Sequence, residues 1–235
     1  MVVKPYHHIP IQDCGEPLVP IPLEQFAVVT PHPYMVLGAP YGEHSPYYVR
    51  AGVLRALLQA QRHLQRQNPG WRIQIFDAYR PVAVQQFMVD HTYQQLLHTW
   101  ASQQPAGSQE APPASLVDQV HQFWAVPSHD LTTPPPHSTG AAIDITLVNE
   151  HQQAVDMGSE IDEISERSYP NYFADRPGGK AFDQHRTRLA SAMQAAGFHQ
   201  HPQEWWHFSL GDQLWAWLAQ DSEQDFQTAR YGRAE

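Results

Sequence analysis

Residues 137–148 read HSTGAAIDITLV, and this stretch decides the fold. Three apolar residues (Ile143, Ile145 and Leu147) alternate with Ala142, Asp144 and Thr146, and this period of two is typical of a β-strand. The strand turns its apolar side chains to the core and Asp144 to the other face. Burying a carboxylate there without a partner would cost several kcal/mol. The pattern therefore predicts a core strand whose aspartate binds a cation.

His137 lies seven positions before Asp144, across a turn that contains Gly140. Histidine and aspartate are both ligands that zinc accepts, and small residues at a turn let the backbone approach a ligand closely. By spacing alone, a histidine and an aspartate beside a turn are more often hydrogen-bonding groups of the surface.

Helical and strand patterns alternate along the rest of the chain. Apolar residues recur at three- and four-residue steps in 49–67, which predicts an amphipathic helix that ends at Pro69-Gly70. The other elements that we expect are a strand at 71–76, helices at 82–100, 115–124 and 180–196, the last capped by Gly197, and a β-prone run at 205–208. Without a regular β–α repeat, they predict an α+β single domain with a small central antiparallel sheet flanked by helices.

The first 48 residues are rich in proline, tyrosine and glycine and show no sustained period. We expect residues 1–48 to form an extended, loop-rich N-terminal arm that wraps a single domain formed by residues 49–235. The proline-rich stretch 102–136 is expected to be an excursion between strands.

The composition excludes several classes of function. The 235 residues include 42% hydrophobic and 16% charged residues, with no run of about 18 apolar residues, which argues against a membrane-spanning protein. The net charge of −10 argues against nucleic acid as a partner. A single cysteine, Cys14, excludes an internal disulfide and a thiolate-rich zinc site. The N-terminus does not resemble a secretory signal, so we expect a cytoplasmic protein.

Residues 204–207 read EWWH and hold a second pair of polar groups, Glu204 and His207. In a regular strand, an odd spacing would put the two on opposite faces, so we predict irregular backbone at 203–206. The plain alternative is a solvated loop acid beside a core histidine. His199 and His201 lie nearby; we expect them at the surface, and the alternative is that one of them supports the site beside Glu204.

Residues 77–81 read DAYRP and follow a predicted strand. Arg80 at such a position can hold a carboxylate or face a developing oxyanion. The plain alternative is an internal ion pair with Asp77.

Taken together and in their order along the chain, the motifs resemble those of the zinc-dependent D-alanyl-D-alanine dipeptidase family. The resemblance covers about residues 45–210 and is carried by 76–81, 137–144, 156–162, 166–168, 195–198 and 204–208. It implies hydrolysis of the small dipeptide D-alanyl-D-alanine by metal-activated water. It also implies that His137, Asp144 and His207 bind one Zn²⁺ per chain. By the same resemblance, Glu204 is the catalytic base, Arg80 stabilises the transition state, and Asp162 receives the substrate's amino group.

One position departs from the family pattern. Pro135 stands where the best-known dipeptidase has a serine that helps to hold the substrate, and proline offers no side-chain hydrogen bond. The group that binds the substrate's carboxylate is therefore unassigned. A zinc D,D-carboxypeptidase or endopeptidase of peptidoglycan stem peptides stays an alternative, as do a non-catalytic zinc-binding module and, given 15 histidines, a metal buffer. The sequence leaves the oligomeric state open.

Overall fold

The computed structural model describes residues 4–105, 110–219 and 228–234. Its centre is a five-stranded sheet with the strand order β2-β4-β5-β7-β6. The strands are β2 (Ala27–Val28), β4 (Arg72–Asp77), β5 (Ala142–Val148), β6 (His199–Gln200) and β7 (His207–Ser209).

The pairs β4–β5, β5–β7 and β6–β7 are antiparallel, which confirms the predicted central antiparallel sheet. The sequence did not indicate β2, which comes from the N-terminal segment and pairs parallel with β4 at the sheet edge. Two residues are too few to show a period, so this strand had no sequence signal.

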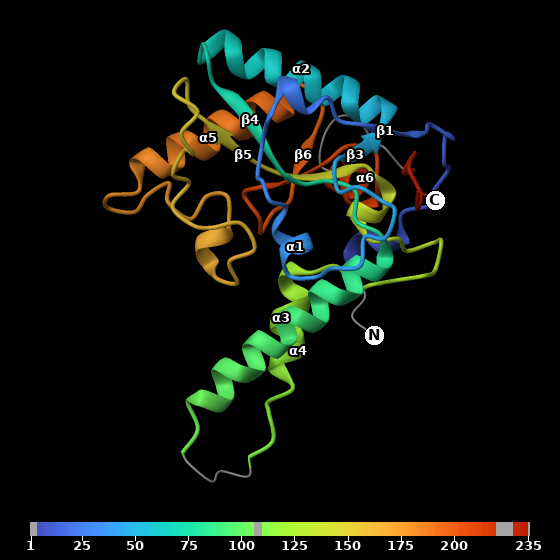
Figure 1. Cartoon of the computed structure of the whole chain (residues 1–235), viewed down its shortest axis with the longest axis vertical. Helices are drawn as coiled ribbons and strands as arrows, with labels where there is room; N and C mark the ends of the chain where they lie inside the picture. Colours follow the sequence, from blue (N-terminus) through green and yellow to red (C-terminus); the bar gives the residue numbers. More distant parts are fainter. Residues whose placement is uncertain (1–3, 106–109, 220–227, 235) are drawn as a thin grey trace.

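Helices α2 (Ala51–Gln67) and α5 (Lys180–Gln194) contact each other and cover one face of the sheet (Figure 1). The alternating apolar residues of β4 and β5 face these helices and form the main core, with side chains such as Leu57, Ile73, Ile143 and Leu189 fully buried. Gly197 ends α5 at φ +92°, and the hydrogen bonds Gly197 N–Gln194 O and Phe198 N–Met193 O close the predicted glycine cap. The opposite face of the sheet carries the site.

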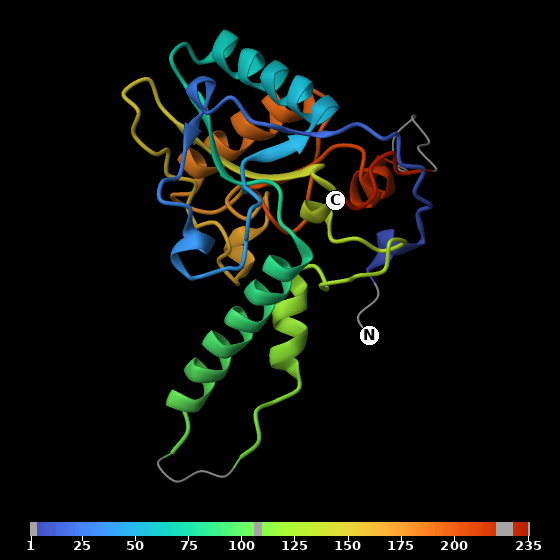
Figure 2. The ribbon, with the colours of Figure 1, turned by 45° about the vertical axis from the view of Figure 1, so that its right-hand side comes forward.

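A helical hairpin projects away from the sheet (Figures 1 and 2). It consists of α3 (Val82–Ser102) and α4 (Ser115–Phe123), both predicted from the sequence. A second apolar cluster joins its base to α1 (Pro33–Val36) and comprises Tyr34, Tyr41, Val84, Met88, Val89, Val120 and Trp124. The hairpin therefore starts beside the polar face of the sheet.

The remaining elements are short. They are η1 (Pro5–His8), β1 (Leu18–Pro20), η2 (Leu23–Gln25), β3 (Tyr48–Arg50), η3 (Pro136–Thr139), η4 (Glu166–Ser168) and α6 (Gln213–Leu218). Strands β1 and β3 form a small antiparallel sheet, and η1 contacts α6. In the described parts of the chain, no helix is both long enough and apolar enough to cross a membrane.

Candidate metal centre and active site

The register of the central sheet brings Asp144 and His207 together. The two residues lie opposite each other in the antiparallel pair β5–β7, so their side chains share one face. His207 Nδ1 is 3.1 Å from Asp144 Oδ1. This face is the one turned away from the core isoleucines, as the alternation in β5 predicted.

His137 reaches the same point from η3, which leads into β5. The turn ends at Gly140 with φ +70°, and a Cβ at that position would come within 2.3 Å of Leu18 Cδ2. A side chain at this position would be strained, so the turn favours glycine. His137 Nε2 is 3.2 Å from Asp144 Oδ2 and 3.2 Å from His207 Nδ1.

The ring nitrogens of the two histidines are arranged as a metal requires. His137 Nδ1 donates a hydrogen bond to the carbonyl oxygen of Ala78 (2.7 Å), which leaves the Nε2 lone pair free. His207 Nε2 is 3.4 Å from Ser209 Oγ, and this hydroxyl in turn donates to Asp212 Oδ2 (2.8 Å). The His207 Nδ1 lone pair and a carboxylate oxygen therefore face the His137 lone pair at short range, an arrangement that a cation stabilises.

The distances between these groups also fit one ion. The candidate ligand atoms of His137, Asp144 and His207 lie within 4.8 Å of one another, and the closest pairs are 3.1–3.2 Å apart. Ligands at about 2.0–2.2 Å from a tetrahedral ion such as zinc are about 3.3–3.6 Å apart. All three side chains are buried, at 2–5% exposure. This donor set fits a divalent metal.

Glu204 lies beside this cluster and precedes β7. The backbone turns at 202–203 and bends at 205–206, which confirms the predicted irregularity. Glu204 Oε2 is 3.7 Å from His207 Nδ1. Burial, together with the negative charges of Asp144 and Asp162, holds the pKa of Glu204 well above its usual value. The acid is thus a buried group of the site and not a solvated loop residue.

Arg80 forms the internal ion pair with Asp77 and also contacts Asp144, which the sequence did not indicate. Its Nη2 lies 2.8 Å from Asp77 Oδ2 and 3.2 Å from Asp144 Oδ2. The rings of Tyr34 and Trp124 flank the guanidinium, with centroids at 5.1 and 5.0 Å. Although burial alone would lower it, the pKa of Arg80 is raised above its usual value by Tyr34 and the two carboxylates, so Arg80 stays cationic.

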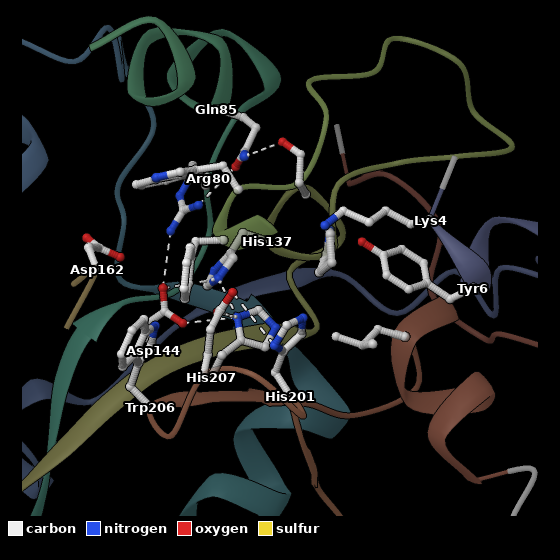
Figure 3. Close-up of a pocket in the computed structure, with 16 residues that line it drawn as sticks. Lys4, Tyr6, Arg80, Gln85, His137, Asp144, Asp162, His201, Trp206 and His207 are labelled. Atoms are coloured by element: carbon white, nitrogen blue, oxygen red, sulfur yellow. Dashed lines mark hydrogen bonds and ion pairs between the residues drawn. The ribbon is translucent and has the colours of Figure 1, made fainter. Parts of the chain in front are cut away.

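Asp162 lies in the same pocket, at the end opposite to His201 (Figure 3). Tyr34 OH donates a hydrogen bond to its Oδ2 at 2.7 Å. Burial and the nearby Asp144 carboxylate raise the pKa of Asp162 to about 7. Its backbone has φ +65°, in the left-handed region that aspartate adopts more readily than most residues other than glycine.

The structure thus brings all six sequence-predicted residues to one pocket. The pocket is lined by Lys4, Tyr6, Arg80, Gln85, Phe123, Trp124, Ala125, Pro136, His137, Asp144, Asp162, His201, Glu204, Trp206, His207 and Leu214 (Figure 3).

Sequence reasoning missed several side chains that line the pocket or contact its residues. The expected surface placement of His201 is wrong, because its Nδ1 lies 3.7 Å from Glu204 Oε1 and its ring packs against His207. Lys4, Tyr6 and Tyr34 come from the N-terminal segment, where no pattern singled them out. The cluster of aromatic residues at 34–48 was the only hint of a packed surface there.

Comparisons with known proteins show which family the chain belongs to. The family model for D-Ala-D-Ala dipeptidases, peptidase M15, matches residues 28–229. The chain is 51% identical to a D-alanyl-D-alanine dipeptidase of Synechocystis, over 99% of this chain and 98% of that protein. It is 30% identical to a D-alanyl-D-alanine dipeptidase of Enterococcus faecium over 61% of this chain and 64% of that protein. A solved LD-carboxypeptidase aligns with 92% of this chain and 77% of its own, at a TM-score of 0.47 and 14% identity. The chain therefore belongs to the M15 family of D-Ala-D-Ala dipeptidases.

Proposed function

We propose that this protein is a zinc-dependent dipeptidase that hydrolyses D-alanyl-D-alanine. The observation that carries the proposal is the convergence of two imidazole lone pairs and a carboxylate, with Glu204 and Arg80 at the same pocket. The 51% identity to a D-alanyl-D-alanine dipeptidase over nearly the whole chain supports this substrate.

His137 Nε2, His207 Nδ1 and an Asp144 oxygen would hold the zinc ion. Three protein ligands leave a coordination position for water or substrate, as catalytic zinc sites do. When bound, zinc lowers the pKa of a coordinated water from about 15.7 toward 7 and polarises the peptide carbonyl. His137 Nδ1 donates to Ala78 O, and His207 Nε2 donates to Ser209 Oγ. These two hydrogen bonds determine which nitrogen of each ring faces the ion.

Glu204 would accept the proton of the attacking water and pass it to the amine nitrogen of the leaving alanine. Its Oε2 is 3.7 Å from His207 Nδ1, so the carboxylate could take a proton from a water held beside this ligand atom. Its raised pKa favours a proton carrier over a permanently charged group. Arg80 would stabilise the negative charge that develops on the peptide oxygen, a contribution typically worth about 10²–10³ in rate.

Asp162 would bind the free amino group of the dipeptide. Its Oδ1 makes no recorded hydrogen bond within the described residues, while its Oδ2 accepts one from Tyr34. A bound ammonium group would favour the charged form of this carboxylate. Glu204 and Asp162 therefore have separate tasks, proton transfer and substrate binding.

The test is a hydrolysis assay with the zinc-loaded full chain and four substrates: D-alanyl-D-alanine, L-alanyl-L-alanine, N-blocked D-alanyl-D-alanine and a pentapeptide stem that ends in D-alanyl-D-alanine. We expect rapid hydrolysis of the free D,D-dipeptide and little of the others. Glu204→Gln should lower kcat by about 10²–10⁴ at unchanged zinc content. Glu24→Gln, an exposed acid of η2, is the matched control and should retain wild-type activity.

Cleavage of the stem peptide but not of the free dipeptide would contradict the proposed substrate. Unchanged hydrolysis by Glu204→Gln would contradict the proposed mechanism. The cytoplasmic location stays a prediction, which fractionation of cells that express the tagged full chain tests.

A further inference from the structure

The N-terminal segment supplies one wall of the pocket. Lys4 and Tyr6 both line it, although they lie more than 70 positions before the first of the proposed catalytic residues. Figure 3 shows their polar ends directed toward the side-chain cluster, on the side away from Asp162. Helix η1, which follows Lys4, contacts α6, and Gln213 of α6 donates to the backbone oxygen of Ile9 at 2.6 Å. The segment is therefore fastened to the domain.

Lys4 and Arg80 both line the pocket, but only Arg80 forms ion pairs with carboxylates of the described residues. Arg80 is committed to the carboxylates of Asp77 and Asp144. Lys4 Nζ donates to the carbonyl oxygen of His121 at 2.5 Å, and no carboxylate lies within ion-pair distance of it among the described residues. An ammonium group has three N–H donors, so two have no partner in the part of the chain that the structure describes and can bind a ligand.

The Tyr6 hydroxyl offers a second hydrogen-bond donor beside the Lys4 ammonium group. Tyr6 is 5% exposed, and burial together with Asp212 and Glu204 raises the pKa of its phenol, so the hydroxyl stays protonated and can donate. A half-buried ammonium group has lost part of its hydration, which lowers the pKa of Lys4, although Glu204 opposes this effect. A bound anion would compensate for that lost hydration.

We propose that Lys4, assisted by the Tyr6 hydroxyl, binds the C-terminal carboxylate of the dipeptide substrate. This assignment rests on the proposed function. A free dipeptide is a zwitterion, and Asp162 and Lys4 offer opposite charges on opposite sides of His137 and Asp144 (Figure 3). A ligand that spans them places its single peptide bond over the proposed metal ligands. A longer peptide with the same C-terminus has no ammonium group at the position of Asp162.

Pro135 cannot bind the substrate carboxylate, so another residue has to do so. Pro135 has neither a side-chain donor nor a backbone N–H, so it cannot hold a carboxylate. Lys4 would supply a stronger, charge-assisted contact from a segment far away in the sequence.

The experiment compares D-alanyl-D-alanine with its C-terminal amide, which keeps the ammonium group and the scissile bond but lacks the carboxylate charge. The enzymes are the zinc-loaded full chain, Lys4→Met, Lys4→Arg and Tyr6→Phe. Lys4→Met keeps the aliphatic stem, and Lys4→Arg keeps the charge. The readout is the ratio of kcat/KM for the acid to that for the amide.

We expect Lys4→Met to lower kcat/KM for the acid by about 10–100-fold and to leave the amide nearly unchanged, so that the ratio collapses. Lys4→Arg should restore most of the ratio, and Tyr6→Phe should lower it by a few-fold.

An equal loss on both substrates would overturn the assignment, since it would show that Lys4 acts through folding or through Glu204. An unchanged ratio in Lys4→Met, with an active wild type, would overturn it as well and leave the proposed function intact. A zinc-loaded wild type that cleaves neither dipeptide would overturn the proposed function and this assignment together.

Discussion

Asp77 fixes Arg80 above the candidate metal centre, with its Oδ2 2.9 Å from Arg80 Nε and 2.8 Å from Nη2. Asp77 is fully buried and also accepts hydrogen bonds from His32 Nε2 (3.1 Å) and Tyr41 OH (3.0 Å). A shift in register between Ile75 and Asp77 turns the end of β4. In a regular strand, Asp77 would point to the same apolar face as Ile75, two positions before it. Because of the shift, the Asp77 side chain points to the other face.

This pairing predicts two separable effects of Arg80→Ala. Turnover per folded molecule should fall by about 10²–10³, because the developing oxyanion loses its cation. The free energy of unfolding should also fall, by about 3 kcal/mol, because Asp77 keeps a buried charge with fewer partners. Denaturant unfolding and single-turnover kinetics measure the two.

The double variant Arg80→Ala/Asp77→Asn separates the cause of the lost stability from the cause of the lost turnover. Neutralising Asp77 should recover much of the lost stability without recovering turnover. Recovered turnover in the double variant would mean that Arg80 serves the structure alone.

Ser209 should determine how tightly the metal binds. Its hydroxyl is 3.4 Å from His207 Nε2 and donates to Asp212 Oδ2, so it holds the ring with Nδ1 toward Asp144. Ser209→Ala should weaken zinc binding by about 10–100-fold, as measured by competition with a chelator.

The matched control is Ser168→Ala, which removes another buried hydroxyl, one that donates to the backbone oxygen of Glu163. This control should bind zinc as the wild type does. Equal zinc affinity in the Ser209 and Ser168 variants would contradict the role of Ser209.

Asp162 should make the metal-free protein less stable at high pH. Burial raises its pKa to about 7 in the folded state, above the ordinary value of 3.8. The folded state therefore binds more protons than the unfolded state between these values, and stability falls as the pH rises through this window. At pH 8 we expect Asp162→Asn to be more stable than the wild type, by on the order of 2 kcal/mol, and at pH 4 the gain should nearly vanish.

Unfolding of both metal-free proteins in urea from pH 4 to pH 8 measures this difference. The same substitution should raise KM for the dipeptide, because the ammonium group loses its counter-charge. A stability difference that is independent of pH would contradict the raised pKa.

Arg186 should control substrate affinity from outside the pocket. This buried side chain of α5 donates to the backbone oxygens of Met157 (2.7 Å), Tyr169 (2.8 Å) and Arg167 (2.8 Å), on both sides of the loop that carries Asp162. Arg186→Met should raise KM more than it lowers kcat and should destabilise the fold, since these buried carbonyls lose their donor.

Arg188→Met on the same helix is the control, because the Arg188 guanidinium lies over the Trp71 ring. We expect it to leave KM unchanged. An unchanged KM in Arg186→Met would show that Asp162 is held without this arginine.

The regular elements of the fold could be predicted because their signals are local. The periods of α2 and α5 and the alternation of β5 depend on neighbouring residues, and the structure confirms each element within a few positions. The residues of the candidate site could be named because their short motifs together resemble those of a known family, whereas each motif alone had a plain structural alternative.

The contributions of the N-terminal segment could not be predicted in the same way. Lys4 lies beside His121, 117 positions along the chain, and Tyr34 beside Asp162, 128 positions along. Contacts at such separations depend on the assembled fold, and loops leave no period in the sequence. His201 was misplaced for the same reason, because the turn at 202–203 folds its ring back onto His207.

The most direct test of the metal centre is anomalous diffraction from zinc-loaded crystals, recorded above and below the zinc absorption edge, with the metal content of the same protein counted by native mass spectrometry. We expect one ion per chain and one anomalous peak, at about 2.0–2.2 Å from His137 Nε2, His207 Nδ1 and an Asp144 oxygen. A zinc-saturated crystal with no peak between these three side chains, or with its ion bound to other residues, would contradict the proposed centre.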